Sequence, residues 1–158
     1  MIGKKRKLGS KLKELKVGQS YSADLTIADK ELLLFLGLTD DANPLYIQHD
    51  YASQTPFKQP LVPPVMLIGF INSAISMYLP GPGCHIVEQQ VTYPHPVYHY
   101  AVLSLYLEVT DINEEDHLIT VMVKVEDEEG RIVVDGKMKV CPAYELESMN
   151  AKSLENFY

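Results

Sequence analysis

One apolar run, Val65 to Leu79, is hydrophobic on nearly every face and is interrupted only by an asparagine and two serines. Pro63 and Pro64 precede it, and proline is favourable at the first position of a helix because its φ is already close to the helical value. A helix of this length spans about 22 Å, which crosses a small sheet but not a lipid bilayer. The run therefore predicts a buried central helix, which the Pro-Gly-Pro-Gly segment at 80–83 ends.

Four later segments alternate between apolar and polar residues with a period of two, the pattern of half-buried strands. Their predicted inner faces consist of Val87, Gln89, Val91 and Tyr93; of Leu103, Leu105, Leu107 and Val109; of Ile119, Val121, Val123 and Val125; and of Val134, Gly136, Met138 and Val140. The opposite faces are mostly polar, as an antiparallel sheet with one wet face requires. Turns are predicted at residues 113–116 and 128–130.

Upstream of the apolar run, Gln19 to Thr26 predicts a strand, and Thr26 and Asp29 offer N-cap chemistry for a helix that ends near Leu38. A loop follows, and residues 50–59 predict a short helix and a turn. With 158 residues, 46% of them hydrophobic, the chain suits one domain. We predict an α+β fold, a single hot-dog domain in which an antiparallel β-sheet wraps around a central apolar helix.

Half of the basic residues lie at the amino end: seven of 14 fall within the first 16 positions, where Glu14 is the only acid. The rest of the chain carries seven basic against 20 acidic side chains, which argues against a nucleic-acid-binding body. We expect residues 1–16 to be a basic N-terminal tail, residues 17–142 the folded domain and residues 143–158 a C-terminal tail. Leu8, Leu12 and Leu15 follow helical spacing, but a solvated segment is the simplest interpretation of the basic tail.

No stretch approaches the roughly 18 uninterrupted apolar residues of a membrane span, and no apolar segment follows the basic N-terminus as in a signal peptide. We therefore expect a cytoplasmic protein without membrane association. Cys84 and Cys141 have no metal-ligand spacing, and we expect them to be small buried side chains rather than a disulfide. Neither a metal ion nor another cofactor is expected.

The segment Asp41-Ala42-Asn43-Pro44-Leu45-Tyr46 lies just past the predicted first helix. Asn43 precedes Pro44, which disfavours helical dihedral angles, so the helix must end before Asn43. A carboxylate and an amide are thereby presented on a short, stiff loop at a helix end. Taken locally, Asp41 and Asn43 are explained by Asx-type hydrogen bonds within the turn.

From about Val17 to Cys141 the chain resembles the MaoC-like hot-dog family of (R)-specific enoyl-thioester hydratases and dehydratases. The family's pattern is Asp-x-Asn-Pro-x-His, followed by Pro-(Ile/Leu)-Val-x-Gly-Met at the start of the central helix. Here the first part is Asp41, Asn43 and Pro44 with Tyr46 in place of histidine, and the second is Pro60-Leu61-Val62-Pro63-Pro64-Val65-Met66. Leu79-Pro80-Gly81, Gln89 and Tyr93 also stand where the family tends to have Leu-Pro-Gly and a Gln-x-x-x-Phe strand.

The resemblance implies a water held between aspartate and histidine, which adds to C3 of a 2-enoyl thioester while a proton reaches C2. Asp41 then has the carboxylate role, Asn43 braces the loop, and Tyr46 stands in the histidine position. A phenol, with an ordinary pKa of about 10, is a poor base at pH 7, but it orients a water or donates a hydrogen bond. His49 is either a compensating imidazole, if positions 46 and 49 share a helical turn, or a surface residue.

Backbone N–H groups at the start of the central helix are further implied to hold the thioester carbonyl. Pro63 and Pro64 have no N–H, so Val65 and Met66 are the first available donors. Gln89, a polar residue on an otherwise apolar strand face, is expected to meet a partner in the core or a ligand.

Three functions fit these residues. The first is a hydratase/dehydratase acting on an acyl-CoA or acyl-carrier-protein thioester, weakened by Tyr46. The second is a non-catalytic acyl-thioester-binding subunit that pairs with an active homologue, and the third is a hot-dog acyl-CoA thioesterase. Each predicts a homodimer or a larger symmetric oligomer, because a single hot dog leaves a sheet edge exposed. The basic tail then attracts phosphates of coenzyme A or an acidic carrier protein.

Overall fold

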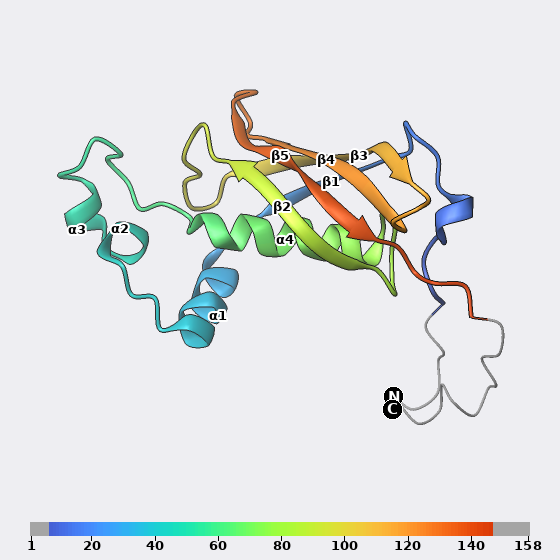
Figure 1. The fold of residues 1–158 in the computed structure, drawn as a ribbon. Coiled ribbons are helices and arrows are strands. Elements are labelled where there is room, and N and C mark those ends of the chain that lie inside the picture. Colours follow the sequence, from blue (N-terminus) through green and yellow to red (C-terminus); the bar gives the residue numbers. More distant parts are fainter. Residues whose placement is uncertain (1–6, 147–158) are drawn as a thin grey trace.

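The framework of the protein is one antiparallel sheet of five strands, arranged in the order β1-β3-β4-β5-β2. The computed structural model describes residues 7–146. Its strands are β1 (Ser20–Thr26), β2 (His85–Thr92), β3 (Val102–Asn113), β4 (Leu118–Glu126) and β5 (Ile132–Cys141). One long helix, α4 (Pro64–Met77), lies along one face of this sheet, as Figure 1 shows.

The core forms between α4 and the inner face of the sheet. The predicted alternation is confirmed in β3 and β4, where every second residue from Leu103 to Val109 and from Ile119 to Val125 is buried. On α4 the buried side chains are Met66, Leu67, Ile68, Ile71, Ala74 and Ile75. Each fully buried aliphatic side chain stabilises the fold by roughly 1.5–3 kcal/mol. The predicted α+β hot-dog domain is therefore confirmed, with the central helix beginning at Pro64 and ending at Met77.

The inner face predicted for β2 is wrong at Val87, and Gln89 is exposed at the edge of the sheet although it pairs with the buried Met138. The pairing of β2 with β5 changes register between Ile86 and Glu88, so Ile86 packs against the core in place of Val87. β2 also forms one edge of the sheet, and no further strand of the described chain covers it. A bulge at an edge strand thus moved the alternation by one residue.

Residues 27–63, between β1 and α4, project beyond the end of the sheet (Figure 1), and we name this segment the overhang. It contains the helix α1 (Asp29–Thr39) and two single turns, α2 (Pro44–Ile47) and α3 (His49–Ala52). The helix α1 was predicted, α3 begins one residue before the predicted short helix, and α2 lies where a loop was expected.

The N-cap of α1 differs from the prediction. Its N-cap residue is Ala28, whose N–H donates to Oε2 of Glu31 at 3.1 Å, so neither Thr26 nor Asp29 has this role. Asp29 instead accepts a hydrogen bond from the hydroxyl of Tyr100, which raises the pKa of Tyr100. The first turn of α1 is thereby joined to the connection between β2 and β3.

The N-terminal segment packs against the loop that follows α4. Gly9 N–H donates to the carbonyl of Pro82 at 2.8 Å, and Ser10 N–H donates to that of Pro80 at 2.9 Å. The side chain of Leu15 belongs to the core. The expectation that the basic segment is solvated is therefore wrong for the part that contains Leu15. A single 3₁₀ turn, η1 (Leu12–Glu14), replaces the amphipathic helix that the leucine spacing allowed.

The other expectations about the ends and the cysteines have mixed outcomes. Cys84 and Cys141 are half-buried and form no disulfide, as expected. Most of the predicted C-terminal tail, residues 147–158, lies outside the described residues. Within residues 7–146, no helix combines the length and the apolar character needed to cross a bilayer.

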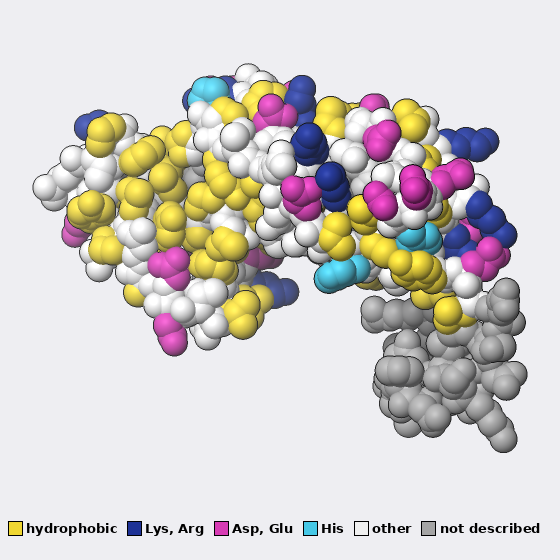
Figure 2. Space-filling model, viewed as in Figure 1, with side chains coloured by type: hydrophobic (Ala, Val, Ile, Leu, Met, Phe, Trp, Pro, Cys, Tyr) yellow, Lys and Arg dark blue, Asp and Glu magenta, His cyan; other side chains and the backbone are white. Residues whose placement is uncertain are grey.

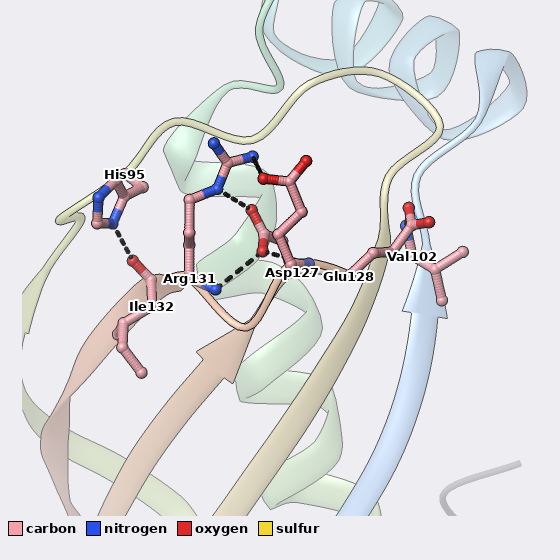
Figure 3. A network of polar contacts seen from close by, with 7 residues as sticks. His95, Val102, Asp127, Glu128, Arg131 and Ile132 are labelled. Atoms are coloured by element: carbon pink, nitrogen blue, oxygen red, sulfur yellow. Dashed lines mark hydrogen bonds and ion pairs between the residues drawn. The ribbon is translucent and has the colours of Figure 1, made fainter.

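Polar contacts at the β4–β5 turn hold the connection between β2 and β3 (Figure 3). Asp127 Oδ1 accepts from the N–H groups of Glu129 and Arg131, both at 2.9 Å, and its Oδ2 accepts from Arg131 Nε at 2.8 Å. Partial burial opposes ionisation of Asp127, but these donors outweigh it and lower the pKa of its carboxyl group. His95 Nδ1 lies 3.1 Å from the carbonyl oxygen of Ile132, which ties the connection to β5.

Candidate functional site

A chain of local hydrogen bonds shapes the loop that carries Asp41. The helix α1 is followed by Asp40, whose left-handed φ of 56° allows its N–H to donate to the carbonyl of Leu36 at 2.8 Å. Asn43 N–H donates to Asp41 Oδ1 at 3.3 Å, and Asn43 Oδ1 accepts from Leu45 N–H at 3.0 Å. The expected Asx-type bonds are therefore present, and the helix ends before Asn43 as predicted.

Asp41 is half-buried as a whole residue, but the bond between its Oδ1 and the Asn43 N–H is exposed. Within residues 7–146 the one hydrogen-bond partner of the carboxylate is the Asn43 N–H, through Oδ1. The second oxygen, Oδ2, is consequently available to a water or a substrate. A carboxylate oriented by one backbone donor and free at its other oxygen has what a general base needs.

Tyr46 and His49 lie in different helical turns. Tyr46 is half-buried in α2, whereas His49 is exposed at the start of α3. Gln48 separates the two turns with an extended conformation, φ −116° and ψ 109°. The premise that positions 46 and 49 share one helical turn is wrong, because the chain is not helical between them.

The start of α4 offers fewer donors than the sequence indicated. Pro63 is its N-cap and Pro64 its first residue, so neither contributes an N–H. Met66 N–H donates to the carbonyl of Pro63 at 3.0 Å, and its side chain is buried. Val65 is 56% exposed, and within the described chain its N–H has no backbone partner. Of the two predicted donors, Val65 alone is free to bind a carbonyl.

A backbone hydrogen bond brings the overhang to the start of α4. Leu61 N–H donates to the carbonyl of Leu45 at 3.0 Å. The carbonyl of Leu61 in turn lies 3.1 Å from Nε2 of His99. Leu45, the residue before Tyr46, is therefore hydrogen-bonded to Leu61. Leu61 lies four residues before Val65 in the sequence. The structure thus ties α2 to Leu61, three residues before α4 begins, and among the described residues it shows no hydrogen bond from the Asp41 loop to Val65.

Gln89 does not belong to this arrangement. Its side chain is exposed on β2, so the expectation that it would meet a partner in the core is wrong. It lines a shallow hollow of about 250 Å³ between β2 and α4, together with Asn72. Among the described residues Asn72 Oδ1 is buried and lacks a hydrogen-bond partner, which costs about 1–3 kcal/mol. In the sequence, Asn72 stands out as the one amide side chain in the apolar run from Val65 to Leu79.

The comparison with known proteins agrees with this geometry. The family model described as MaoC like domain matches residues 12–130. The chain is 32% identical over 127 residues to the (R)-specific enoyl-CoA hydratase of Rhodospirillum rubrum, an alignment that covers 80% of this chain and 88% of that protein. It is 26% identical over 126 residues to the (R)-specific enoyl-CoA hydratase of Aeromonas caviae, with coverages of 80% and 94%.

Solved structures give the same result. The unliganded R-hydratase PhaJ1 of Pseudomonas aeruginosa superposes with a TM-score of 0.79 at 28% identity, over 90% of this chain and 94% of that one. The (R)-hydratase of Aeromonas caviae superposes with a TM-score of 0.76 at 26% identity, over 80% and 96%. The family model covers most of the chain, and the similarity extends over nearly the whole length of these relatives. The chain therefore belongs to the MaoC-like family, that of the (R)-specific enoyl-CoA hydratases and dehydratases.

Proposed function

We propose that the protein is an (R)-specific enoyl-thioester hydratase/dehydratase with Asp41 and Tyr46 as its proton-handling pair. It adds water reversibly to a 2-enoyl-CoA or 2-enoyl-carrier-protein. The observation that carries the proposal is the carboxylate of Asp41, oriented by the Asn43 N–H on a loop whose next residues are hydrogen-bonded, at Leu45, to Leu61 just before α4. The relatives named as enoyl-CoA hydratases support the same substrate class.

Each group has one role in this reaction. Asp41 Oδ2 takes a proton from the bound water as the water oxygen forms its bond to C3. The π electrons of the C2–C3 bond move toward the thioester carbonyl, where the Val65 N–H and the positive end of the α4 dipole stabilise the negative charge. The protonated Asp41 then gives its proton to C2, which regenerates the carboxylate. Tyr46 orients the water as a hydrogen-bond donor, since a phenol is a poor base near neutral pH.

Tyr46 in the histidine position sets the expected rate. Losing one general acid–base group typically costs 10² to 10⁴ in rate, or roughly 3–5 kcal/mol of barrier. With one free N–H at the start of α4, the carbonyl is also held by fewer donors than two adjacent amides would give. We therefore expect an enzyme that is slow compared with relatives that have both acid–base groups.

The second candidate is a subunit that binds acyl thioesters and pairs with an active homologue. Two observations favour it: the tyrosine at position 46, and the bond from Met66 N–H to Pro63, which withdraws one carbonyl donor. Binding without turnover is the property that separates this candidate from the first.

We further propose a homodimer built on the exposed surfaces of α4 and β2. On α4 the side exposed to solvent has a spacing of four residues and consists of Val65, Gly69, Ser73 and Met77. The small residues at its centre allow two helices to approach closely, and β2 offers an unpaired edge. Across a two-fold axis, β2 pairs with the partner's β2 and the two α4 helices pack antiparallel. Asn72 lies beside this seam, where a second protomer supplies hydrogen-bond partners.

Apolar side chains of the overhang support the same assembly. Hydrophobic groups gather over the overhang end of the molecule (Figure 2), and those that are exposed include Leu33, Leu34, Leu38, Ile47 and Tyr51. Exposed apolar surface of this kind is typical of interfaces.

Gel filtration tests the assembly: Ser73→Arg should lower the native mass to that of one chain. Thr110→Arg, on the outer face of β3, should leave the mass unchanged, and a wild-type monomer would contradict the proposal.

One assay separates the candidate functions. Purified protein with crotonyl-CoA should cause loss of enoyl absorbance and form the (R)-3-hydroxy product. Release of free thiol without loss of absorbance would instead identify a thioesterase. Saturable binding with neither reaction, together with co-purification of a homologue from the native host, would identify the binding subunit.

A further inference from the structure

A hollow of about 410 Å³ lies between the N-terminal segment and the end of α4. Lys7, Ser10 and Lys11 line one side of it, and Tyr78 and Pro80 line the other. Its volume falls within the roughly 300–1,000 Å³ of small-molecule sites. Two ammonium groups and a hydroxyl suit phosphates, and a solvent-facing phenol ring suits a flat heterocycle.

Tyr78 is held in place by a second ring. It is 64% exposed, yet it stacks on Tyr21 with a centroid separation of 4.7 Å and an interplanar angle of 6°. Stacking fixes one face of the ring and leaves the side chain open to solvent. An aromatic ring that is already immobilised binds a base with little loss of side-chain entropy.

Charge also points to an anionic ligand. Beyond residue 16 the chain has 20 acidic and seven basic side chains, so the body repels a molecule that carries several phosphates. Lys7 is exposed, and Lys11 contacts Glu14, which also lines the hollow, at 3.7 Å from Nζ to Oε1. The family model begins at residue 12, so Lys7, Ser10 and Lys11 precede the residues that it matches.

The hollow and the candidate site lie at opposite ends of α4. In Figure 1 the overhang lies at the Pro64 end of α4, and the first described residues of the chain lie at its Met77 end. A helix of 14 residues separates the two ends by about 21 Å. In the two-fold dimer proposed above the helices run antiparallel, so Met77 of one protomer lies beside Val65 of its partner. The hollow of each protomer then adjoins the other protomer's site.

From these observations we propose that the hollow binds the nucleotide end of coenzyme A while the acyl chain occupies the partner protomer's site. Lys7 and Lys11 bind the phosphates, and Tyr78 stacks on the adenine. This inference rests on the proposed function and on the two-fold dimer. It assigns the chain to coenzyme A thioesters in preference to carrier-protein thioesters, because only the former carry an adenine nucleotide.

The first test compares crotonyl-CoA with crotonyl-pantetheine, which lacks the nucleotide. Combining Lys7→Glu and Lys11→Glu should raise the KM for crotonyl-CoA by about threefold to tenfold, as expected for two exposed ion pairs, and leave kcat unchanged. Tyr78→Ala should raise the same KM. Neither variant should alter kinetics with crotonyl-pantetheine, and Lys137→Glu, a single charge reversal on the outer face of β5, should alter the kinetics with neither substrate. Equal effects on both substrates, or no effect on crotonyl-CoA, would overturn the inference.

Mixed dimers test whether the hollow serves the partner's site. One protomer carries the two lysine reversals and the other carries Asp41→Asn, and the two are co-purified through different tags. If the hollow acts across the dimer, the protomer with intact Asp41 uses its partner's intact lysines, and the mixed dimer keeps the wild-type KM. A KM as high as that of the double-lysine homodimer would show that each hollow serves its own protomer and would contradict the proposal.

A binding measurement keeps this inference separate from the proposed function. If wild-type protein hydrates neither substrate, the proposed function fails, and calorimetric titration with coenzyme A alone then decides the inference. Weaker binding by the double-lysine variant and by Tyr78→Ala, with binding unchanged in Lys137→Glu, supports the site. Equal binding of coenzyme A by all variants contradicts the inference. A binding defect that appears with a carrier-protein thioester but not with coenzyme A also contradicts it.

Discussion

The N–H of Leu61 donates to the carbonyl of Leu45 at 3.0 Å, and this backbone contact joins the loop that carries the acid to the entry of the central helix. Tyr46 is the next residue after Leu45, and Val65 is four residues after Leu61, which lies before α4 begins at Pro64. The bond therefore ties two parts of the overhang together next to α4, although most of the overhang projects beyond the sheet. In the proposed reaction, this connection aligns the proton-handling groups with the carbonyl donor.

Replacing Tyr46 tests its role as a hydrogen-bond donor. Tyr46→Phe removes the hydroxyl and should lower kcat for crotonyl-CoA by about tenfold to a hundredfold. Tyr46→His restores an imidazole and should raise kcat by about a hundredfold, because a side chain that can exchange protons near neutral pH then faces Asp41. Steady-state rates for the three proteins decide the point. Equal rates in all three would exclude Tyr46 from the reaction.

Asn43→Ala separates the loop's shape from overall stability. The variant removes the Oδ1 cap on Leu45 N–H and should cost about 1 kcal/mol of unfolding free energy. It should also reduce kcat, since the orientation of Asp41 depends on this turn. Asn113→Ala is the matched control, because Asn113 Oδ1 caps Asp116 N–H at 3.1 Å in the β3–β4 turn. That variant should lose similar stability in urea unfolding but retain its kcat; a parallel loss of kcat in both would contradict the assignment.

Asp127 should make stability depend on pH. Its pKa is lowered in the folded state, so its contribution is fully present above the unfolded pKa of about 4 and disappears as the pH falls through the lower folded value. At pH 7, Asp127→Asn should cost about 1–3 kcal/mol, the range for hydrogen bonds to a charged group. The difference from wild type should shrink toward acid pH in urea unfolding. Asp135→Asn, the same substitution on an exposed face of β5, is the control, and a loss in Asp127→Asn that is as large at acid pH as at pH 7 would contradict the assignment.

Gly136 allows β2 and β5 to approach closely. A Cβ at this position would lie 2.8 Å from Val91 Cα and would collide with the carbonyl oxygen of Gln90, both backbone atoms of β2. Gly136→Ala should therefore cost about 1–3 kcal/mol of unfolding free energy. Gly37→Ala, where a Cβ meets nothing within 4 Å, should instead stabilise α1 by up to about 1 kcal/mol. Equal stabilities of the two variants would contradict this packing.

Sequence patterns predicted the parts of the fold that depend on one repeated physical requirement. The strands β3 and β4 each bury every second residue over a long stretch, so the alternation at Leu103 to Val109 and Ile119 to Val125 identifies them. The alternation does not identify the buried residues of β2, because β2 is an edge strand whose register changes after Ile86. Neither the edge position nor the register change can be recognised from the neighbouring sequence. The pattern there assigned Val87 and Gln89 to the wrong environment.

The candidate site was predictable where local chemistry decides the conformation. The Asx bonds of Asp41 and Asn43 follow from residue type and from the proline at position 44. The break at Gln48, which separates Tyr46 from His49, and the bond from Met66 N–H to Pro63 depend on the path of the chain. The burial of Asn72 Oδ1 without a hydrogen-bond partner among the described residues was not predictable either, because burial arises from tertiary packing.

The most direct test of the account is the rate of crotonyl-CoA hydration by Asp41→Asn compared with Asp40→Asn. Both variants make the same change of charge and nearly the same change of shape in adjacent residues, and asparagine tolerates the left-handed conformation of residue 40. The account predicts that Asp41→Asn lowers kcat at least a hundredfold while Asp40→Asn stays near the wild-type rate. A wild-type rate in Asp41→Asn would contradict the central claim that this carboxylate handles the proton.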